Sequence, residues 1–316
     1  MNMLTLSHVS RRFGEKQVLK DVSFTVPEQT IFGFVGPNGA GKTTTMKIIL
    51  GLLAADSGSI TVNGEDVHFG QNKTNRHIGY LPDVPEFYGY MTPTEYLSFC
   101  GQISDMPSGE LHARIEELLS LVGLSGESGR IRGFSRGMKQ RLGIAQALLH
   151  RPRLLICDEP TSALDPIGRK EILDILIAAK EQTTVLFSTH ILSDVERICD
   201  EIAFLKDGTI MLEGTLDEIK KAHKSTGFLV ELAHAKDAEA FRSAFTLAHQ
   251  TGNAQFLFEE NSPVAMEDVF RFLLEHHIPV LKVESQEPTL ESLFLEVAGI
   301  NPPVTDTDGA LTSDRR

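Results

Sequence analysis

Residues 36–44 carry glycine, lysine and threonine at a spacing suited to holding phosphate groups. They read Gly-Pro-Asn-Gly-Ala-Gly-Lys-Thr-Thr and match the pattern G-x-x-x-x-G-K-[ST] without a mismatch. The glycines let successive backbone N–H groups point into an anion cup, and the lysine adds a full positive charge for the β- and γ-phosphates. We expect the contacts to come from Gly36, Pro37, Asn38, Gly39, Ala40, Gly41, Lys42, Thr43 and Thr44, with the Thr43 hydroxyl placed for Mg²⁺.

The context of this loop favours phosphate binding over the alternative of a glycine-rich turn without a ligand. An apolar run at 31–35 predicts a strand before the loop, and a helical pattern starts near Lys42. The N-terminus of that helix adds the positive end of its dipole to the cup.

Two neighbouring carboxylates follow a second apolar strand, residues 154–157. Strand ends of this kind bind ligands in open α/β sheets. Asp158 would hold Mg²⁺ through water, and Glu159 would face the γ-phosphate and accept a proton from an attacking water. On spacing alone, a solvated pair of loop acids is equally compatible with the sequence, and the phosphate loop favours the catalytic interpretation.

Three further sites belong with these motifs. Ser135 and Gly137 open a predicted helix and could form a second anion site. Taken alone, an ordinary N-cap is the better interpretation of the serine, and only the acidic strand about twenty residues later favours the anion site. Asp165 precedes Pro166 and reads as the cap of another helix. His190 ends a strand at the same predicted sheet edge and could hydrogen-bond a γ-phosphate oxygen, the alternative being a structural histidine.

In this order the motifs resemble the ATP-binding subunit of ATP-binding cassette (ABC) transporters. The resemblance covers residues 1–220 and rests on Walker A (36–44), the signature (134–140), Walker B (154–159), the D-loop (162–165) and the switch histidine, His190. It implies a head-to-tail dimer that sandwiches two ATP molecules. Ser135, Gly137 and Asp165 would then lie at the nucleotide of the other copy. Phe13 stands where the family places a ring that stacks on adenine, and the alternative is that it packs inside the fold.

The sequence departs from the family pattern at two places. Asp83 occupies the position of a glutamine that contacts the metal and couples to the membrane subunit, and a carboxylate there could still reach Mg²⁺. Phe134, Arg136 and Met138 replace the more usual leucine, glycine and glutamine of the signature. These departures, and the residues 287–294, resemble the ABC-2 branch of drug-resistance and antibiotic-export ATPases, which implies export through a separately encoded permease.

Composition restricts the classes of partner. The chain has 316 residues and a formal net charge of −13, which disfavours direct binding to nucleic acid or to an anionic membrane surface. No apolar run reaches the ~18–20 residues that span a bilayer, and the first residues lack a signal-peptide core. The three cysteines form no CxxC pair. We therefore expect the cytoplasmic face of the membrane, with contact to the membrane only through the permease.

The predicted fold class is α/β, a P-loop ABC cassette followed by a small α+β module. The cassette, 1–220, would have a RecA-like parallel sheet, an antiparallel β-subdomain and a helical subdomain at about 90–150. Residues 226–299 read as a βαβαβα string that resembles a ferredoxin-like sandwich, with a helix at 289–297, and 300–316 as a disordered tail.

The sequence thus predicts an ATPase that uses ATP and Mg²⁺ to drive transport, paired with a second ATP-binding subunit that is either the same chain or a related one. The membrane partner would dock near 83–91, where Pro85, Phe87, Tyr88 and Tyr90 stand in a loop. The alternatives are a soluble ABC ATPase acting on a ribosomal or nucleoprotein target and a P-loop kinase. The charge and the single cassette disfavour the first, and the segments around Ser135 and His190 disfavour the second.

Overall fold

The computed structural model describes residues 2–71, 73–222, 227–258 and 262–285, together with Leu290, Leu293 and Phe294. The chain divides into two compact units, Met1–Leu216 and Asp217–Arg316. The predicted tail at 300–316, and all but three positions of the predicted helix at 289–297, lie outside the described residues. No helix of the described part combines the length and the apolar character that crossing a membrane needs.

An antiparallel sheet opens the first unit, with the strand order β2-β1-β4-β5. Asn63 and Gly64 connect its last two strands, and their φ angles of 50° and 75° confirm the type I′ turn that the sequence predicts. The strands are β1 (Asn2–Phe13), β2 (Lys16–Pro27), β4 (Ser57–Val62) and β5 (Glu65–Asp66).

A six-stranded sheet, in the order β10-β9-β3-β8-β7-β6, carries the motif-bearing strands. The pairs from β9 to β6 are parallel, and β10 is antiparallel to β9. Every residue of β3, β7 and β8 is buried, as strands covered on both faces require. The bounds are β3 (Ile31–Val35), β6 (Ile78–Leu81), β7 (Leu154–Asp158), β8 (Thr184–Thr189), β9 (Glu201–Lys206) and β10 (Thr209–Thr215).

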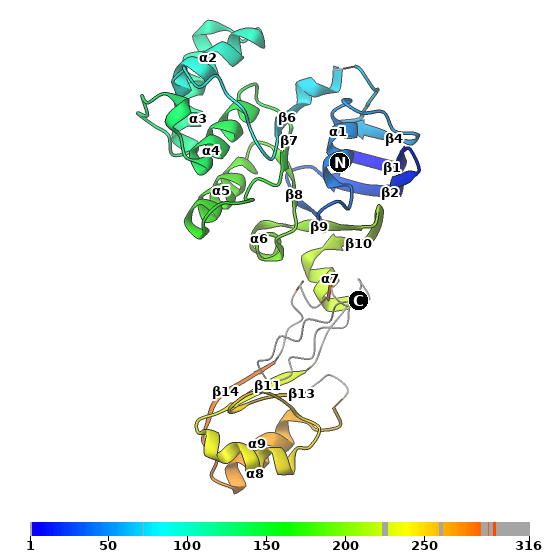
Figure 1. The fold of residues 1–316 in the computed structure, drawn as a ribbon, viewed down its shortest axis with the longest axis vertical. Helices are drawn as coiled ribbons and strands as arrows, with labels where there is room; N and C mark the ends of the chain where they lie inside the picture. The colour runs from blue at the N-terminus through cyan, green and yellow to red at the C-terminus, as the bar shows by residue number, and fades with distance from the viewer. Residues whose placement is uncertain are drawn as a thin grey trace, which may run out of the picture. The chain divides into compact units, whose positions relative to one another are not determined.

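Alternate residues of β7 enter two separate apolar cores, one on each face of this sheet. Leu154 and Ile156 pack with the antiparallel sheet and α1 (Lys42–Ile49), whereas Leu155 and Cys157 pack with the helices on the opposite face. Figure 1 shows these helices grouped on one side of the six-stranded sheet, opposite β1, β2 and β4. They include α2 (Pro93–Ile103), α3 (Ser108–Leu121), α4 (Arg136–Leu148), α5 (Pro166–Ala179) and α6 (Leu192–Ile198).

Local signals fix several of these helix ends. The Thr92 hydroxyl accepts from the N–H of Glu95, whose carboxylate accepts from the N–H of Thr92, so the predicted capping box at the start of α2 is confirmed. The stripe predicted at 111–122 belongs to α3, and Gly123 follows it with a φ of 65°. The remaining short helices are α7 (Leu216–Ala222) and the 3₁₀ turns η1 (Lys73–His77), η2 (Ile131–Gly133) and η3 (Ala235–Asp237).

The second unit is an antiparallel sheet, ordered β12-β13-β11-β14, with helices on one face (Figure 1). Its element order, βαββαβ, is that of a ferredoxin-like sandwich. Phe241 and Phe256 lie at the centre of its apolar core. The elements are β11 (Phe228–Leu232), α8 (Ala238–Ala244), β12 (His249–Gly252), β13 (Gln255–Phe258), α9 (Met266–Glu275) and β14 (Val280–Ser285).

The strand β12 is absent from the sequence prediction, which placed one strand too few in this unit. Its sequence, His-Gln-Thr-Gly, has no apolar alternation, and three of its four residues are exposed at the sheet edge. An edge strand without a buried face gives no periodic signal.

Gly79→Ala is expected to destabilise the first unit. An added Cβ on this β6 residue would lie 2.1 Å from the carbonyl oxygen of Ala147 in α4, so backbone must move. We expect the free energy of unfolding to fall by about 3 kcal/mol, the upper end of overpacking costs, in urea denaturation. Gly109→Ala is the control, because a Cβ there meets no atom within 4 Å and alanine favours α3. Equal stability of the two variants would contradict the close packing of β6 on α4.

Candidate functional site

The glycine loop connects β3 to α1 and is pinned at both ends. A Cβ on Gly36 would lie 2.3 Å from the carbonyl oxygen of Leu205, and one on Gly41 would lie 2.6 Å from Leu19 Cδ2. Gly41 also has a φ of 119°, which side chains rarely allow. The middle of the loop, at 37–39, is exposed. The loop is therefore pinned at both ends while its middle faces solvent. The N–H groups of Gly36 and Ala40 donate to the carbonyl oxygens of Thr189 and Pro37.

Lys42, the first residue of α1, lies across this loop with only 5% of its surface exposed. Its ammonium donates to the carbonyl oxygens of Gly36 at 2.6 Å and Pro37 at 3.2 Å, and pairs with Glu159 Oε1 at 3.0 Å. An ammonium has three donors, so these three acceptors use all of them.

Glu159 links this cation to an imidazole. Its Oε1 contacts Lys42, and its Oε2 lies 2.9 Å from His190 Nδ1. The geometry places the imidazole proton on Nδ1, because an ionised carboxylate can only accept. Glu159 has a φ of 48°, a left-handed conformation that costs a non-glycine residue about 1–2 kcal/mol. Strain of this kind concentrates where a side chain must be aimed for function.

Asp158, the last residue of β7, directly precedes Glu159 and is almost fully buried. Ser188, its register partner on β8, donates to Asp158 Oδ1 at 2.7 Å and accepts from the N–H of Glu159 at 3.0 Å. Burial, together with the charge of Asp158, raises the pKa of Tyr80 to about 12. The Ser188 hydroxyl thus fixes Asp158 and the backbone of Glu159 together at the sheet edge.

Ser188 is a residue that sequence reasoning missed. The available signal was a serine near the end of a buried strand whose middle residues, 185–187, are apolar, in a sheet where β7 and β8 are neighbours. A polar side chain in a fully buried strand needs a hydrogen-bond partner. The partner could not be assigned without the strand register.

The other predicted contact residues lie around the loop. Thr43 is exposed in the first turn of α1, and Thr44 follows it half-buried. Ala40 is buried. Phe13 ends β1 with its ring 46% exposed, and the Arg11 guanidinium lies 4.8 Å from the centre of that ring.

A second group of predicted residues lies at the starts of α4 and α5. The Ser135 hydroxyl accepts from the N–H of Met138, and Asp165 accepts from the N–H of Gly168, so both are N-caps. Gly137, in the first turn of α4, is partly exposed. Within the described part of the chain, no hydrogen bond or ion pair joins Ser135 to the glycine loop.

Asp83 lies with this second group. Its carboxylate accepts from Ser162 at 2.7 Å and from Arg136 at 3.3 Å. The structure therefore gathers Lys42, Asp158, Glu159 and His190 at the glycine loop, and Asp83 with the α4 and α5 helix starts.

Two known families match separate parts of the sequence. The family described as ABC transporter matches residues 19–162. The family described as ATP-binding protein DrrA1-3-like, C-terminal domain, matches residues 214–298.

Several relatives match nearly the whole chain. The ABC transporter ATP-binding protein YxlF of Bacillus subtilis is 38% identical over 93% of this chain and 99% of its own. The linearmycin resistance ATP-binding protein LnrL of the same organism is 36% identical over 94% and 98%. The bacitracin transport ATP-binding protein BcrA of Bacillus licheniformis is 33% identical over 94% and 97%.

Solved structures share the fold of the first unit. An ATP-binding subunit of an ABC transporter is 34% identical, with a TM-score of 0.63 over 70% of this chain and 93% of its own. A dimeric ATP-binding cassette in a post-hydrolysis state, bound to ADP and Pi, is 26% identical, with a TM-score of 0.60 over 68% and 99%.

Ser188→Ala is expected to lower the free energy of unfolding by about 1–3 kcal/mol. The change leaves Asp158 Oδ1 and the N–H of Glu159 without their shared partner in a buried site, and such groups lose their full solvation. Chemical denaturation measures the change. Ser120→Ala, on the exposed side of α3, is the control and should stay within about 0.5 kcal/mol. A Ser188 variant as stable as that control would contradict the bridging role.

Proposed function

Because this chain belongs to the family of ABC transporter ATP-binding proteins, we propose that two copies of it clamp two ATP molecules and drive export through a membrane permease. The chain is the ATP-hydrolysing subunit of an ABC transporter. The predictions of the cassette fold and of ATPase function are confirmed by the similarity to ATP-binding cassettes. The head-to-tail arrangement, the residue roles and the permease are proposals.

The contacts of the Glu159 carboxylate with Lys42 and His190, beside the glycine loop, are the main support for this proposal. The γ-phosphate of ATP would take the place of the Glu159 carboxylate on the Lys42 ammonium. Glu159 would then be free to accept a proton from the attacking water, and His190 would face the phosphate through Nε2. The N–H groups of 38–44, apart from that of Ala40, would hold the other phosphate oxygens.

The residues present fit a magnesium ion. Mg²⁺ commonly takes one or two carboxylates together with water and phosphate oxygens. The described residues contain no cluster of three or more histidine, cysteine or carboxylate side chains that could hold a metal alone. The buried Asp158 carboxylate and the exposed Thr43 hydroxyl would supply the protein side, and the ion would neutralise phosphate charge. We assign Phe13 to the adenine ring.

The start of α4 supports the dimer. Ser135 is exposed, and its hydroxyl accepts from the N–H of Met138. The N–H groups of Arg136 and Gly137, at the positive end of the helix dipole, would therefore face a second anion. We assign them to the γ-phosphate bound by the other copy, with Asp165 at the same interface. The likeness to a dimeric cassette supports this assembly. A related chain could take the place of the second copy.

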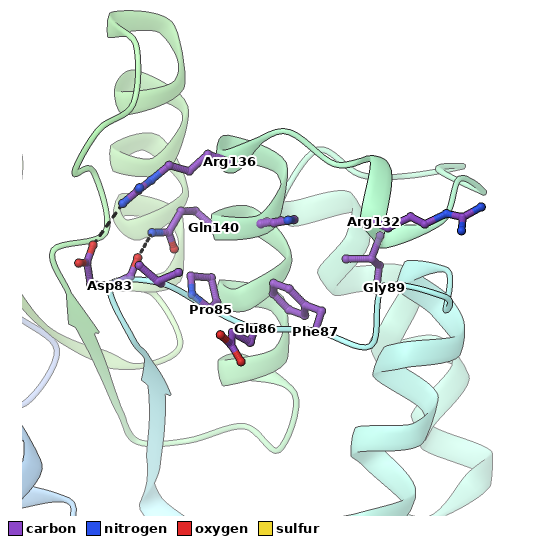
Figure 2. A pocket seen from close by; sticks show the side chains of 11 residues that line it. Asp83, Pro85, Glu86, Phe87, Gly89, Arg132, Arg136 and Gln140 are labelled. Atoms are coloured by element: carbon purple, nitrogen blue, oxygen red, sulfur yellow. Dashed lines mark hydrogen bonds and ion pairs between the residues drawn. The ribbon is translucent and has the colours of Figure 1, made fainter.

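A groove of about 450 Å³ beside α4 fits the proposed permease contact. It is lined by Pro85 and Phe87 and by charged side chains of both signs, including Glu86 and Arg132 (Figure 2). Tyr88 and Tyr90, in the segment that the sequence singles out, are also exposed. Such a surface suits an amphipathic cytoplasmic segment of a membrane protein. The chain would then act at the cytoplasmic face of the membrane.

The relatives favour export over the other classes that the sequence left open. LnrL is named for linearmycin resistance and BcrA for bacitracin transport. The alternative of a cassette that acts on a ribosome or nucleoprotein finds no support in these relatives. A net charge of −13 also disfavours contact with nucleic acid.

Glu159→Gln should retain ATP binding and lower kcat by about 100-fold or more, the usual contribution of a positioned general base. Binding is measured by calorimetry and turnover by phosphate release from the purified chain. Glu181→Gln, an exposed carboxylate beyond α5, is the control and should hydrolyse ATP at the wild-type rate. Full activity of the Glu159 variant would contradict the assigned role.

A further inference from the structure

The segment after β6 is fastened along one face of α4. Gln140 is fully buried and donates from Nε2 to the carbonyl oxygen of Asp83 at 2.7 Å. At Gly143 an added Cβ would lie 2.5 Å from Leu81 Cδ1, so the helix and the segment are in close contact. Arg136 donates to the Asp83 carboxylate (Figure 2). The three helix residues are spaced by four and three, which places them on one face.

The Asp83 carboxylate, in the segment after β6, also binds side chains from α4 and from the loop after β7. Its Oδ1 accepts from Ser162 Oγ at 2.7 Å and from Arg136 at 3.3 Å, and Arg136 donates to Ser162 Oγ at 3.0 Å. Ser162 belongs to the loop after β7, where its N–H donates to the carbonyl oxygen of Glu159 at 3.0 Å. One carboxylate oxygen therefore joins the segment after β6, the first residue of α4 and the loop that carries Glu159.

Asp83 and Arg136 both depart from the family pattern, and their side chains carry opposite charges. Asp83 and Arg136 differ from the usual glutamine and glycine of two separate motifs, and the structure brings them into contact. Glycine has no side chain that could reach position 83, and a glutamine there carries no charge. The pair in this chain makes a charge-assisted hydrogen bond, which is stronger than a neutral one.

We propose that Asp83 is a positioning residue that sets the start of α4 and the Glu159 loop in one arrangement, and not a ligand of Mg²⁺. This inference rests on the proposed function, because the neighbours of Arg136, Ser135 and Gly137, are assigned there to the γ-phosphate of the other copy. Residues 84–89 line the proposed permease groove directly after Asp83. A permease that shifts this segment would therefore move Asp83. Through Asp83 it would act on the start of α4 and on the loop that carries Glu159.

A double-mutant cycle on the full chain tests this role. We expect Asp83→Ala and Arg136→Ala each to lower the kcat for ATP hydrolysis about three- to tenfold with little change in KM. Either change removes the contact that positions the start of α4 and the loop that carries Glu159. The double variant should be no slower than the slower single variant. Exchange of the charges, D83R with R136D, should recover part of the rate. Asp83→Asn, which keeps the shape and one acceptor oxygen, should fall between wild type and Asp83→Ala.

The pair between Asp174 and Arg197 is the matched control. Its atoms lie 2.9 Å apart, and its side chains are 52% and 40% exposed, against 49% and 44% for Asp83 and Arg136. Alanine at either control position should leave kcat within about twofold, since this hydrogen bond joins α5 to α6 and not to the start of α4 or the loop that carries Glu159. The Mg²⁺ concentration that gives half of the maximal rate should be the same in Asp83→Ala and wild type.

Two results would overturn the positioning role. One is a cycle in which the effects of the two single variants simply add. The other is a raised magnesium requirement in Asp83→Ala or Asp83→Asn, which would make Asp83 a metal ligand. Both need an active wild-type chain. A folded wild-type protein without ATPase activity would instead overturn the proposed function.

Discussion

A buried cation, the Lys42 ammonium, is the constraint around which the sheet edge is arranged. A buried charge must be paired and hydrogen-bonded, and the chain supplies two carbonyl oxygens from the glycine loop and one carboxylate from the end of β7. The carbonyl oxygens can serve only because the loop is pinned at Gly36 and Gly41. The carboxylate can serve only because Glu159 adopts a left-handed conformation. The fold of the parallel sheet thus fixes both halves of one electrostatic site.

This arrangement explains how binding and chemistry can be linked in one side chain. In the structure Glu159 neutralises Lys42. The proposed function implies that an incoming phosphate would compete for the same ammonium. Under the proposed function, binding of the phosphate would release the carboxylate to act as a base. His190 holds the second oxygen of the carboxylate at 2.9 Å and limits where it can move. Asp158 is held separately by Ser188 and would not take part in this exchange.

Most of the first unit could be predicted from the sequence because its signals are local. The glycine loop, the capping box at Thr92 and the type I′ turn at Asn63 each depend on residues within a few positions of one another. The contacts of Asp83 could not be predicted in this way. They join residues 53 and 79 positions apart, and their geometry depends on how α4 packs on β6. The same limit applies to Ser188, which needed the strand register, and to β12, which has no apolar period.

The most direct test of the central claim is the assembly state of full-length Glu159→Gln with Mg²⁺ and ATP, measured by sedimentation velocity. A nucleotide clamped between the glycine loop of one copy and the α4 start of another predicts a monomer without ATP and a dimer with it. Ser135→Arg in the same background should bind ATP and remain a monomer. A Glu159→Gln chain that is saturated with ATP and stays monomeric at every protein concentration would contradict the claim.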